Sequence, residues 1–76
     1  MEQGKEIGRH LGNVEWFNRN YGFIRPANEG DRDIFVYYEH ILCEGFKTLK
    51  KGQRVEYSIG SNKRGQPIAI DVVVIK

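Results

Sequence analysis

The chain of 76 residues has few of the features that mark disulfide-stabilised, membrane-spanning or strongly basic proteins. Its single cysteine, Cys43, excludes an internal disulfide and indicates a reducing compartment. No apolar run approaches the ~20 residues of a membrane helix, and residues 1–6 lack the apolar core of a signal peptide. The net charge is only +2, too small for a binder that relies on charge alone. These absences predict one small cytoplasmic domain, and we expect a monomer.

The chain also lacks a constellation of catalytic or metal-binding residues. His40 and Cys43 are three residues apart, but a tetrahedral metal site needs more ligands than the chain places near them. A Cys–His nucleophile would need a pocket and an oxyanion hole, which a domain of this size has little room to enclose. No Gly-Lys-Ser or Gly-Lys-Thr loop is present to hold a nucleotide phosphate. We therefore expect no enzyme activity, no metal and no cofactor, with Cys43 as a small apolar core residue.

What the sequence does contain is aromatic residues in alternation. Tyr21 and Phe23 are two residues apart, as are Phe35 and Tyr37. Because side chains alternate faces along a strand, these four rings should share one face of a sheet, and the aliphatic residues between them should enter the core. Four exposed rings side by side would favour aggregation unless a ligand covers them. Flat rings on an open sheet suit the π-faces of unpaired bases.

The remaining pattern predicts a small antiparallel all-β barrel with little helix. A polar, glycine-spaced tail is expected over residues 1–9 and the folded domain over residues 10–76. Strands are expected over residues 10–18, 21–26, 33–38, 54–59 and 67–75, with one helical turn within residues 39–43. Val55, Tyr57 and Ile59 should face the core from the fourth strand. In the fifth strand, Ile68, Ile70, Val72 and Val74 should share one face, and this strand should cover the barrel or pair with the first.

Several residues allow two interpretations. Val14 should point inward, but Trp16 and Phe17 cannot both face one side without a bulge, so the direction of Trp16 stays open. Gly22 serves either packing between rings or the close approach of a strand. Asp33 either bonds to a base or holds the preceding turn. Tyr38 either faces a ligand or packs under a loop.

In order and spacing, four motifs resemble the cold-shock domain. They are Val14-Glu15-Trp16-Phe17-Asn18, Tyr21-Gly22-Phe23-Ile24, Asp33-Ile34-Phe35-Val36-Tyr37-Tyr38 and Gly45-Phe46-Lys47-Thr48-Leu49. Three positions depart from the family pattern. Glu15 stands where the family has a lysine, Tyr37 replaces a histidine, and a shorter turn leaves Arg19 as the basic turn residue.

The resemblance implies a five-stranded OB-type barrel that binds single-stranded DNA or RNA, with a leaning toward pyrimidine-rich strands. The ligand-facing rings it implies are Trp16, Phe17, Tyr21, Phe23, Phe35, Tyr37, Tyr38 and Phe46, and Asp33, Lys47 and Arg64 match polar positions of the same surface. Arg25, Lys47, Lys63 and Arg64 could hold the phosphate backbone. Binding of unpaired strands alone would make the protein an ATP-independent RNA chaperone. The alternative is a barrel that serves as a protein-interaction module, which Glu15 favours.

Overall fold

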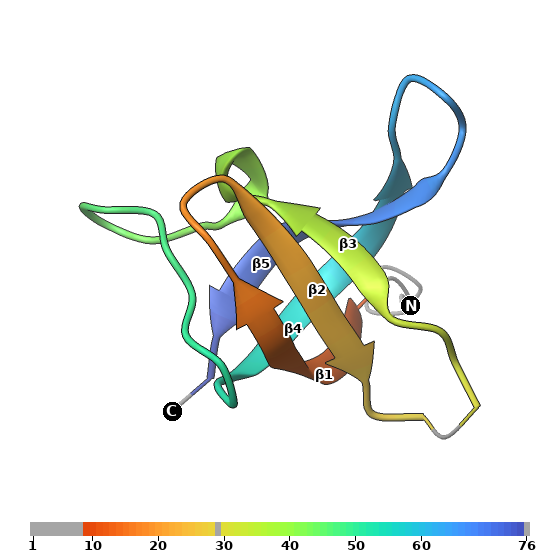
Figure 1. The fold of residues 1–76 in the computed structure, drawn as a ribbon, viewed down its shortest axis with the longest axis horizontal. Coiled ribbons are helices and arrows are strands. Elements are labelled where there is room, and N and C mark those ends of the chain that lie inside the picture. Colours follow the sequence, from red (N-terminus) through yellow and green to blue (C-terminus); the bar gives the residue numbers. More distant parts are fainter. Residues whose placement is uncertain (1–8, 29, 76) are drawn as a thin grey trace, which may run out of the picture.

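The computed structural model describes residues 9–28 and 30–75, which form a closed barrel of five strands (Figure 1). The strands are β1 (Arg9–Phe17), β2 (Tyr21–Pro26), β3 (Ile34–Tyr37), β4 (Arg54–Ser61) and β5 (Pro67–Val74). Around the barrel they follow the order β1-β2-β3-β5-β4, and β4 pairs with β1 to close it. The all-β, five-stranded prediction is therefore confirmed. The expected tail falls mainly on residues 1–8, which lie outside the described residues, and β1 begins at Arg9.

Strand direction differs in one place from the expected antiparallel barrel. β3 and β5 run parallel, with Phe35 opposite Ile68 and Val36 opposite Ala69, whereas the other neighbouring strands are antiparallel. A parallel pair needs a long crossover, and here the crossover consists of the connection after β3 together with all of β4. β5 thus pairs with β3 and β4, and not with β1.

The core consists of aliphatic side chains from every strand together with the ring of Tyr57. Val14, Ile24, Val36 and Val55 are at most 2% exposed, and Tyr57 is 1% exposed. The inward directions predicted for these residues are confirmed. Burial raises the pKa of the Tyr57 hydroxyl, and the charge of Asp31 adds to the effect. The core holds the inner side of β2 and β3 in place, so the outer side of both strands is available.

Two predictions about β4 and β5 are wrong: Ile59 does not enter the core, and the alternating aliphatic residues of β5 do not share one face. Ile59 is 49% exposed, and β4 continues past it to Ser61. On β5, Ala69 and Val72 both belong to the core, because a register shift opposite Glu56–Ser58 inserts one extra residue into β5. Ile68 is buried outside this core cluster. Asp71 has a φ of 51° at this bulge. Arg9 stabilises the bulge, since its Nη1 donates to the carbonyl of Asp71 at 3.0 Å.

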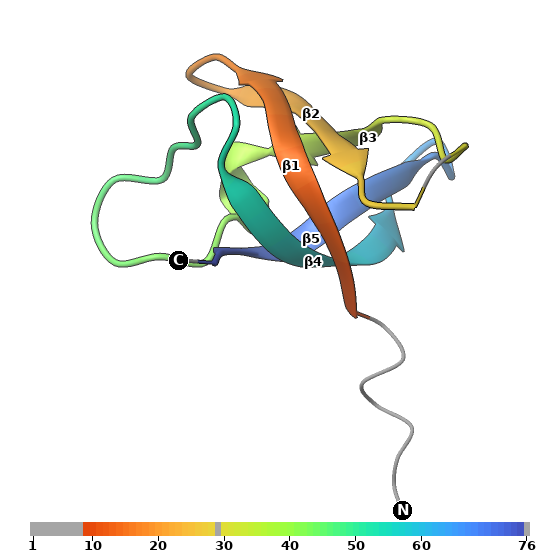
Figure 2. The same ribbon diagram turned by 90° about the horizontal axis from the view of Figure 1, so that it is seen from below.

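The connections lie outside the barrel wall. The predicted helical turn is present as a 3-10 turn, η2 (Tyr38–His40), which begins one residue earlier than expected. The connection between η2 and β4 projects from the barrel in both views (Figures 1 and 2). Cys43 lies on this connection and is exposed, so its predicted core role is wrong. Within residues 9–28 and 30–75, no helix is long and apolar enough to cross a membrane.

Candidate nucleic-acid interface

Local geometry at the start of the sheet sets the direction of the first aromatic side chains. The register between β1 and β2 shifts between Val14 and Trp16, which forms a bulge. As a result Trp16 lies opposite Phe23 and is 41% exposed, whereas Phe17 packs against the core. The side chain of Trp16, whose direction the sequence left open, therefore points outward. Phe17 does not join the outer rings.

Gly22 allows β1 and β2 to approach closely at this bulge. A Cβ atom at Gly22 would lie 2.1 Å from the carbonyl oxygen of Trp16 and 2.7 Å from Cα of Phe17. No side chain fits there without movement of the backbone. Of the two roles considered for Gly22, the structure supports close approach of the neighbouring strand.

A short turn places the next ring. The side-chain oxygen of Asn18 accepts hydrogen bonds from the backbone N–H of Asn20 at 2.7 Å and of Tyr21 at 2.8 Å. The N–H of Tyr38 donates to the carbonyl of Asn20, which ties this turn to the end of β3. Arg19 lies exposed in the turn. The ring of Tyr21 is therefore held beside β3 from the start of β2.

Five rings form a continuous array on the outer face of β1, β2 and β3. We call Trp16, Tyr21, Phe23, Phe35 and Tyr37 the ring array. Ring centroids of neighbours are 4.6–5.7 Å apart, from Phe35–Tyr37 at 4.6 Å to Trp16–Tyr21 at 5.7 Å. Most neighbours meet edge to face, an arrangement that stabilises aromatic pairs. The outward direction predicted for the four strand rings is confirmed.

Phe35 lies at the centre of this array. Its ring is 5.1 Å from that of Tyr21, 5.0 Å from that of Phe23 and 4.6 Å from that of Tyr37. Ile34 and Val36 on either side of it are buried, which fixes the strand face that Phe35 occupies. A base stacked on Phe35 would therefore lie close to three other rings.

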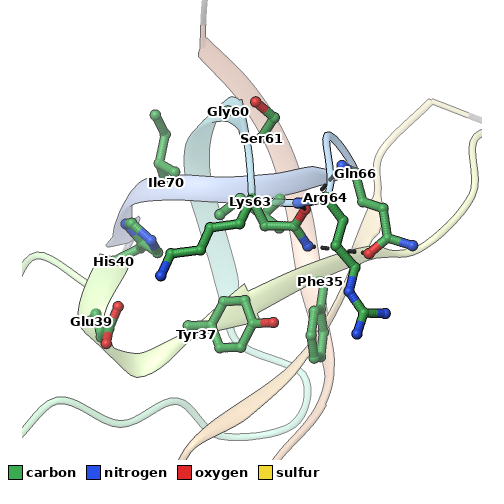
Figure 3. A pocket seen from close by; sticks show the side chains of 12 residues that line it. Phe35, Tyr37, Glu39, His40, Gly60, Ser61, Lys63, Arg64, Gln66 and Ile70 are labelled. Carbon is green, nitrogen blue, oxygen red and sulfur yellow. Dashed lines mark hydrogen bonds between the residues drawn. The ribbon is translucent and has the colours of Figure 1, made fainter.

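Basic residues flank one side of the ring array. The loop between β4 and β5 carries Lys63 and Arg64 into a groove of about 810 Å³, which Phe35 and Tyr37 line from the opposite side. Figure 3 shows Arg64 extending toward the ring of Phe35 and Lys63 extending toward His40. The groove therefore places two cationic side chains beside two aromatic rings, as a site for an anionic chain of planar bases requires.

The same loop is held in shape by Asn62. Its side-chain oxygen accepts from the backbone N–H of Arg64 at 2.9 Å and of Gln66 at 3.0 Å, and Gly65 has a φ of 81°. These bonds present both cations from a defined turn.

The other end of the ring array is differently charged. Nη2 of Arg25 donates to Oε2 of Glu15 at 2.7 Å. This hydrogen bond and the charge of Glu15, with a further contribution from Asp33, raise the pKa of the Arg25 guanidinium. Asp33 also lines a small hollow beside Phe23 and Phe35.

The remaining predicted residues lie apart from the ring array. Tyr38 is 44% exposed in η2, so it does not pack under a loop. Phe46 is 81% exposed on the long connection, and the neighbouring Lys47 is also exposed. Both rings are open to solvent and follow β3 in the chain.

Of the side chains that line the groove, only Phe35, Tyr37, Lys63 and Arg64 were predicted from the sequence. Those not predicted include Glu39, His40, Gln66 and Ile70. No local motif marks them, because the groove forms only when η2 and the β4–β5 loop meet across the parallel β3–β5 pair. Within residues 9–28 and 30–75, no cluster of three or more His, Cys, Asp or Glu side chains could hold a metal ion.

Fold and site together define a class: small closed β-barrels that offer an aromatic platform and adjacent cations to single-stranded nucleic acid. The family model described as 'Cold-shock' DNA-binding domain matches residues 10–75. The chain therefore belongs to the cold-shock domain family of nucleic-acid-binding proteins.

Curated relatives agree with this assignment. The chain is similar to the cold shock-like protein CspE of Escherichia coli K12, with 46% identity over 66 residues that cover 84% of this chain and 93% of CspE. The cold shock-like protein CspC of the same strain shows the same identity and coverage. Among solved structures, Drosophila Unr CSD456 matches with a TM-score of 0.72 and 18% identity. That match covers 90% of this chain but 27% of the Unr chain, and it supports the fold alone.

Proposed function

We propose that the protein binds unpaired RNA or DNA by stacking bases on the ring array. The observation that carries the proposal is the array itself: five contiguous, exposed or half-buried rings on one face of the sheet, next to a groove that carries Lys63 and Arg64. Duplex bases are already stacked on one another, so the array competes only for unpaired ones. Stacking contributes about 1–3 kcal/mol per base, and three or four occupied rings suffice for useful affinity after the strand is ordered.

The same preference supports a role as an RNA chaperone that needs no ATP. A protein that binds only the open form of a hairpin shifts the folding equilibrium of that hairpin toward the open form by mass action. Stacking is tolerant of base identity, so many transcripts would be substrates. We propose a leaning toward pyrimidine-rich strands, action as a monomer and a cytoplasmic location.

The proposed binding unit is the barrel of residues 10–76. Within it, the ring array supplies the stacking platform, and Tyr38 and Phe46, exposed on the chain that follows β3 and apart from the array, offer further rings to the same strand. Lys63 and Arg64 contact phosphates, joined by Lys47 and by Arg19 at the far turn. Asp33 accepts a hydrogen bond from the edge of a base.

Fluorescence of Trp16, the only tryptophan, tests the proposal directly. Trp16 is partly exposed and lies 5.6 Å from Phe23, so a base stacked there should quench its emission. Titration with oligo-dT at low and high salt should give saturable quenching that weakens with salt, and a DNA duplex of the same length should compete poorly. No quenching, together with no NMR shifts at the ring array, would refute the proposal.

The salt dependence also tests the alternative of a protein-interaction module. Phosphate contacts give a steep decrease of affinity with salt, whereas an apolar peptide bound to the same rings would give a shallow one. The ion pair of Glu15 with Arg25, which reduces the positive charge at one end of the ring array, is the observation that favours this alternative.

A further inference from the structure

The ion pair between Glu15 and Arg25 lies at the edge of the ring array. Glu15 precedes Trp16 on β1, Arg25 follows Phe23 on β2 after one buried residue, and the hydrogen bond between them spans the two strands at 2.7 Å. Both groups are accessible to a ligand, since the side chain of Arg25 is 64% exposed and that of Glu15 is 36% exposed. A strand stacked on Trp16 and Phe23 must pass beside them.

Arg25 differs in this respect from the cations of the groove. Within residues 9–28 and 30–75, neither Lys63 nor Arg64 takes part in an ion pair. Arg25 is held by Glu15 and lies in the field of Asp33 as well, and both carboxylates raise its pKa. One of the cations nearest the rings is therefore already neutralised by the protein.

A carboxylate and a phosphate present similar pairs of oxygens to a guanidinium, and arginine binds both through the same planar fork of N–H donors. We propose that Glu15 occupies Arg25 as an intramolecular substitute for a backbone phosphate. A bound strand must displace Glu15 or leave this phosphate without a contact. This inference rests on the proposed function and defines Glu15 as a residue that limits affinity at that same site.

Occupation of Arg25 by Glu15 also affects chaperone action. A strand that makes one phosphate contact fewer binds more weakly and dissociates sooner, because changes within one interface act mainly on the dissociation rate. Glu15 thus favours rapid release of bound strands over long-lived complexes. Release of Arg25 should convert the protein into a tighter binder that releases strands more slowly.

A double-mutant cycle tests this mechanism with fluorescence anisotropy of a dye-labelled oligo-dT, which does not depend on Trp16. Glu15→Gln removes the charge and keeps the shape of the side chain. Glu56→Gln is the matched control, because it removes the same charge from an ion pair with Arg9 on β1 and β4, outside the ring array. Arg25→Gln, alone and combined with Glu15→Gln, completes the cycle.

We expect Glu15→Gln to tighten binding about two- to fivefold at low salt and to slow dissociation by a similar factor. The slope of log affinity against log salt should steepen by about 0.7, the value for one phosphate contact on a single strand. Glu56→Gln should change neither quantity by more than the net charge explains. In the Arg25→Gln background, Glu15→Gln should lose most of its effect.

Two results would overturn the inference while the proposed function stands. Equal effects of Glu15→Gln and Glu56→Gln would show that only net charge matters. An undiminished gain in the Arg25→Gln background would show that Glu15 repels phosphates directly and does not act through Arg25. Absence of binding by the wild-type protein and all variants would overturn both the inference and the proposed function.

Discussion

Removal of the ring of Phe35 is the sharpest test of how the protein holds its ligand. Phe35 lies within 4.6–5.1 Å of three other rings, so a base stacked on it is bounded by the rest of the ring array. One stacked base contributes about 1–3 kcal/mol, which corresponds to a dissociation constant about 5- to 150-fold weaker in Phe35→Ala.

The cost to stability should be smaller than that of a core substitution. Complete truncation of a core phenylalanine costs about 3–5 kcal/mol, whereas Phe35 is only half-buried and its neighbours Ile34 and Val36 keep the core filled. We expect a loss of about 2 kcal/mol, mainly from the three ring contacts. Phe35→Leu keeps more apolar volume, so it should cost less stability and still lose the stacking face.

The assay combines anisotropy of labelled oligo-dT with thermal unfolding followed by circular dichroism. Leu11→Ala is the control, because Leu11 is an apolar β1 residue that is 41% exposed outside the ring array. It should bind like the wild-type protein. If Phe35→Leu unfolds cooperatively and binds within twofold of wild type, stacking on this face is not the source of affinity. If both Phe35 variants are unfolded, the ring is part of the core and the assignment of faces is wrong.

Two further predictions concern the barrel that supports the site. Gly22→Ala should lower the midpoint of thermal unfolding by at least about 4 °C, because its Cβ would lie 2.1 Å from the Trp16 carbonyl oxygen. Gly60→Ala is the control and should cost little, because its Cβ would meet only the flexible side chain of Ile70. Equal midpoints for the two variants would refute the close-approach role of Gly22. Tyr57 has a raised pKa in the folded state, so its contribution to stability is complete below the unfolded value near 10 and is lost as pH rises above it. Tyr57→Phe should therefore move alkaline unfolding to higher pH, measured by circular dichroism between about pH 9 and 12, while Tyr38→Phe at an exposed position should not.

Alternation along β2 and β3 was sufficient to predict the inner and outer faces of the site. Each of these strands is regular, so a period of two assigns Ile24 and Val36 to the core and Phe23 and Phe35 to the surface. The family resemblance, carried by motifs that span both strands, extended this local prediction to the whole barrel.

The same rule failed on β5 because a bulge changes the period. Asp71, with a φ of 51°, lets Ala69 and Val72 both face inward, and nothing in the sequence marks Asp71 as a position with positive φ. The parallel direction of β5 was missed for a related reason. It depends on how far the chain between β3 and β5 reaches, and hydrophobic periodicity carries no information about that.

The charged residues show a second limit of sequence-based prediction. Glu15 and Arg25 were identified separately, one as a repelling charge and the other as a phosphate contact. Their ion pair depends on the register that places Val14 opposite Ile24, which brings two residues ten positions apart into contact. His40 and the β4–β5 loop meet in the groove for a similar reason, through tertiary pairing of β3 with β5.

Closure of the barrel has a consequence for how the protein folds. The ring array belongs to β1, β2 and β3, which are joined by short connections and pair in sequence order. Closure instead depends on distant partners, such as Gly12 with Val55 and Phe35 with Ile68. Because distant pairings must overcome loop-closure entropy first, we expect their formation to limit the folding rate. During synthesis the rings would leave the ribosome before β4 and β5, which cover the aliphatic side of the same sheet, so we expect the platform to become stable only when the last strand is in place.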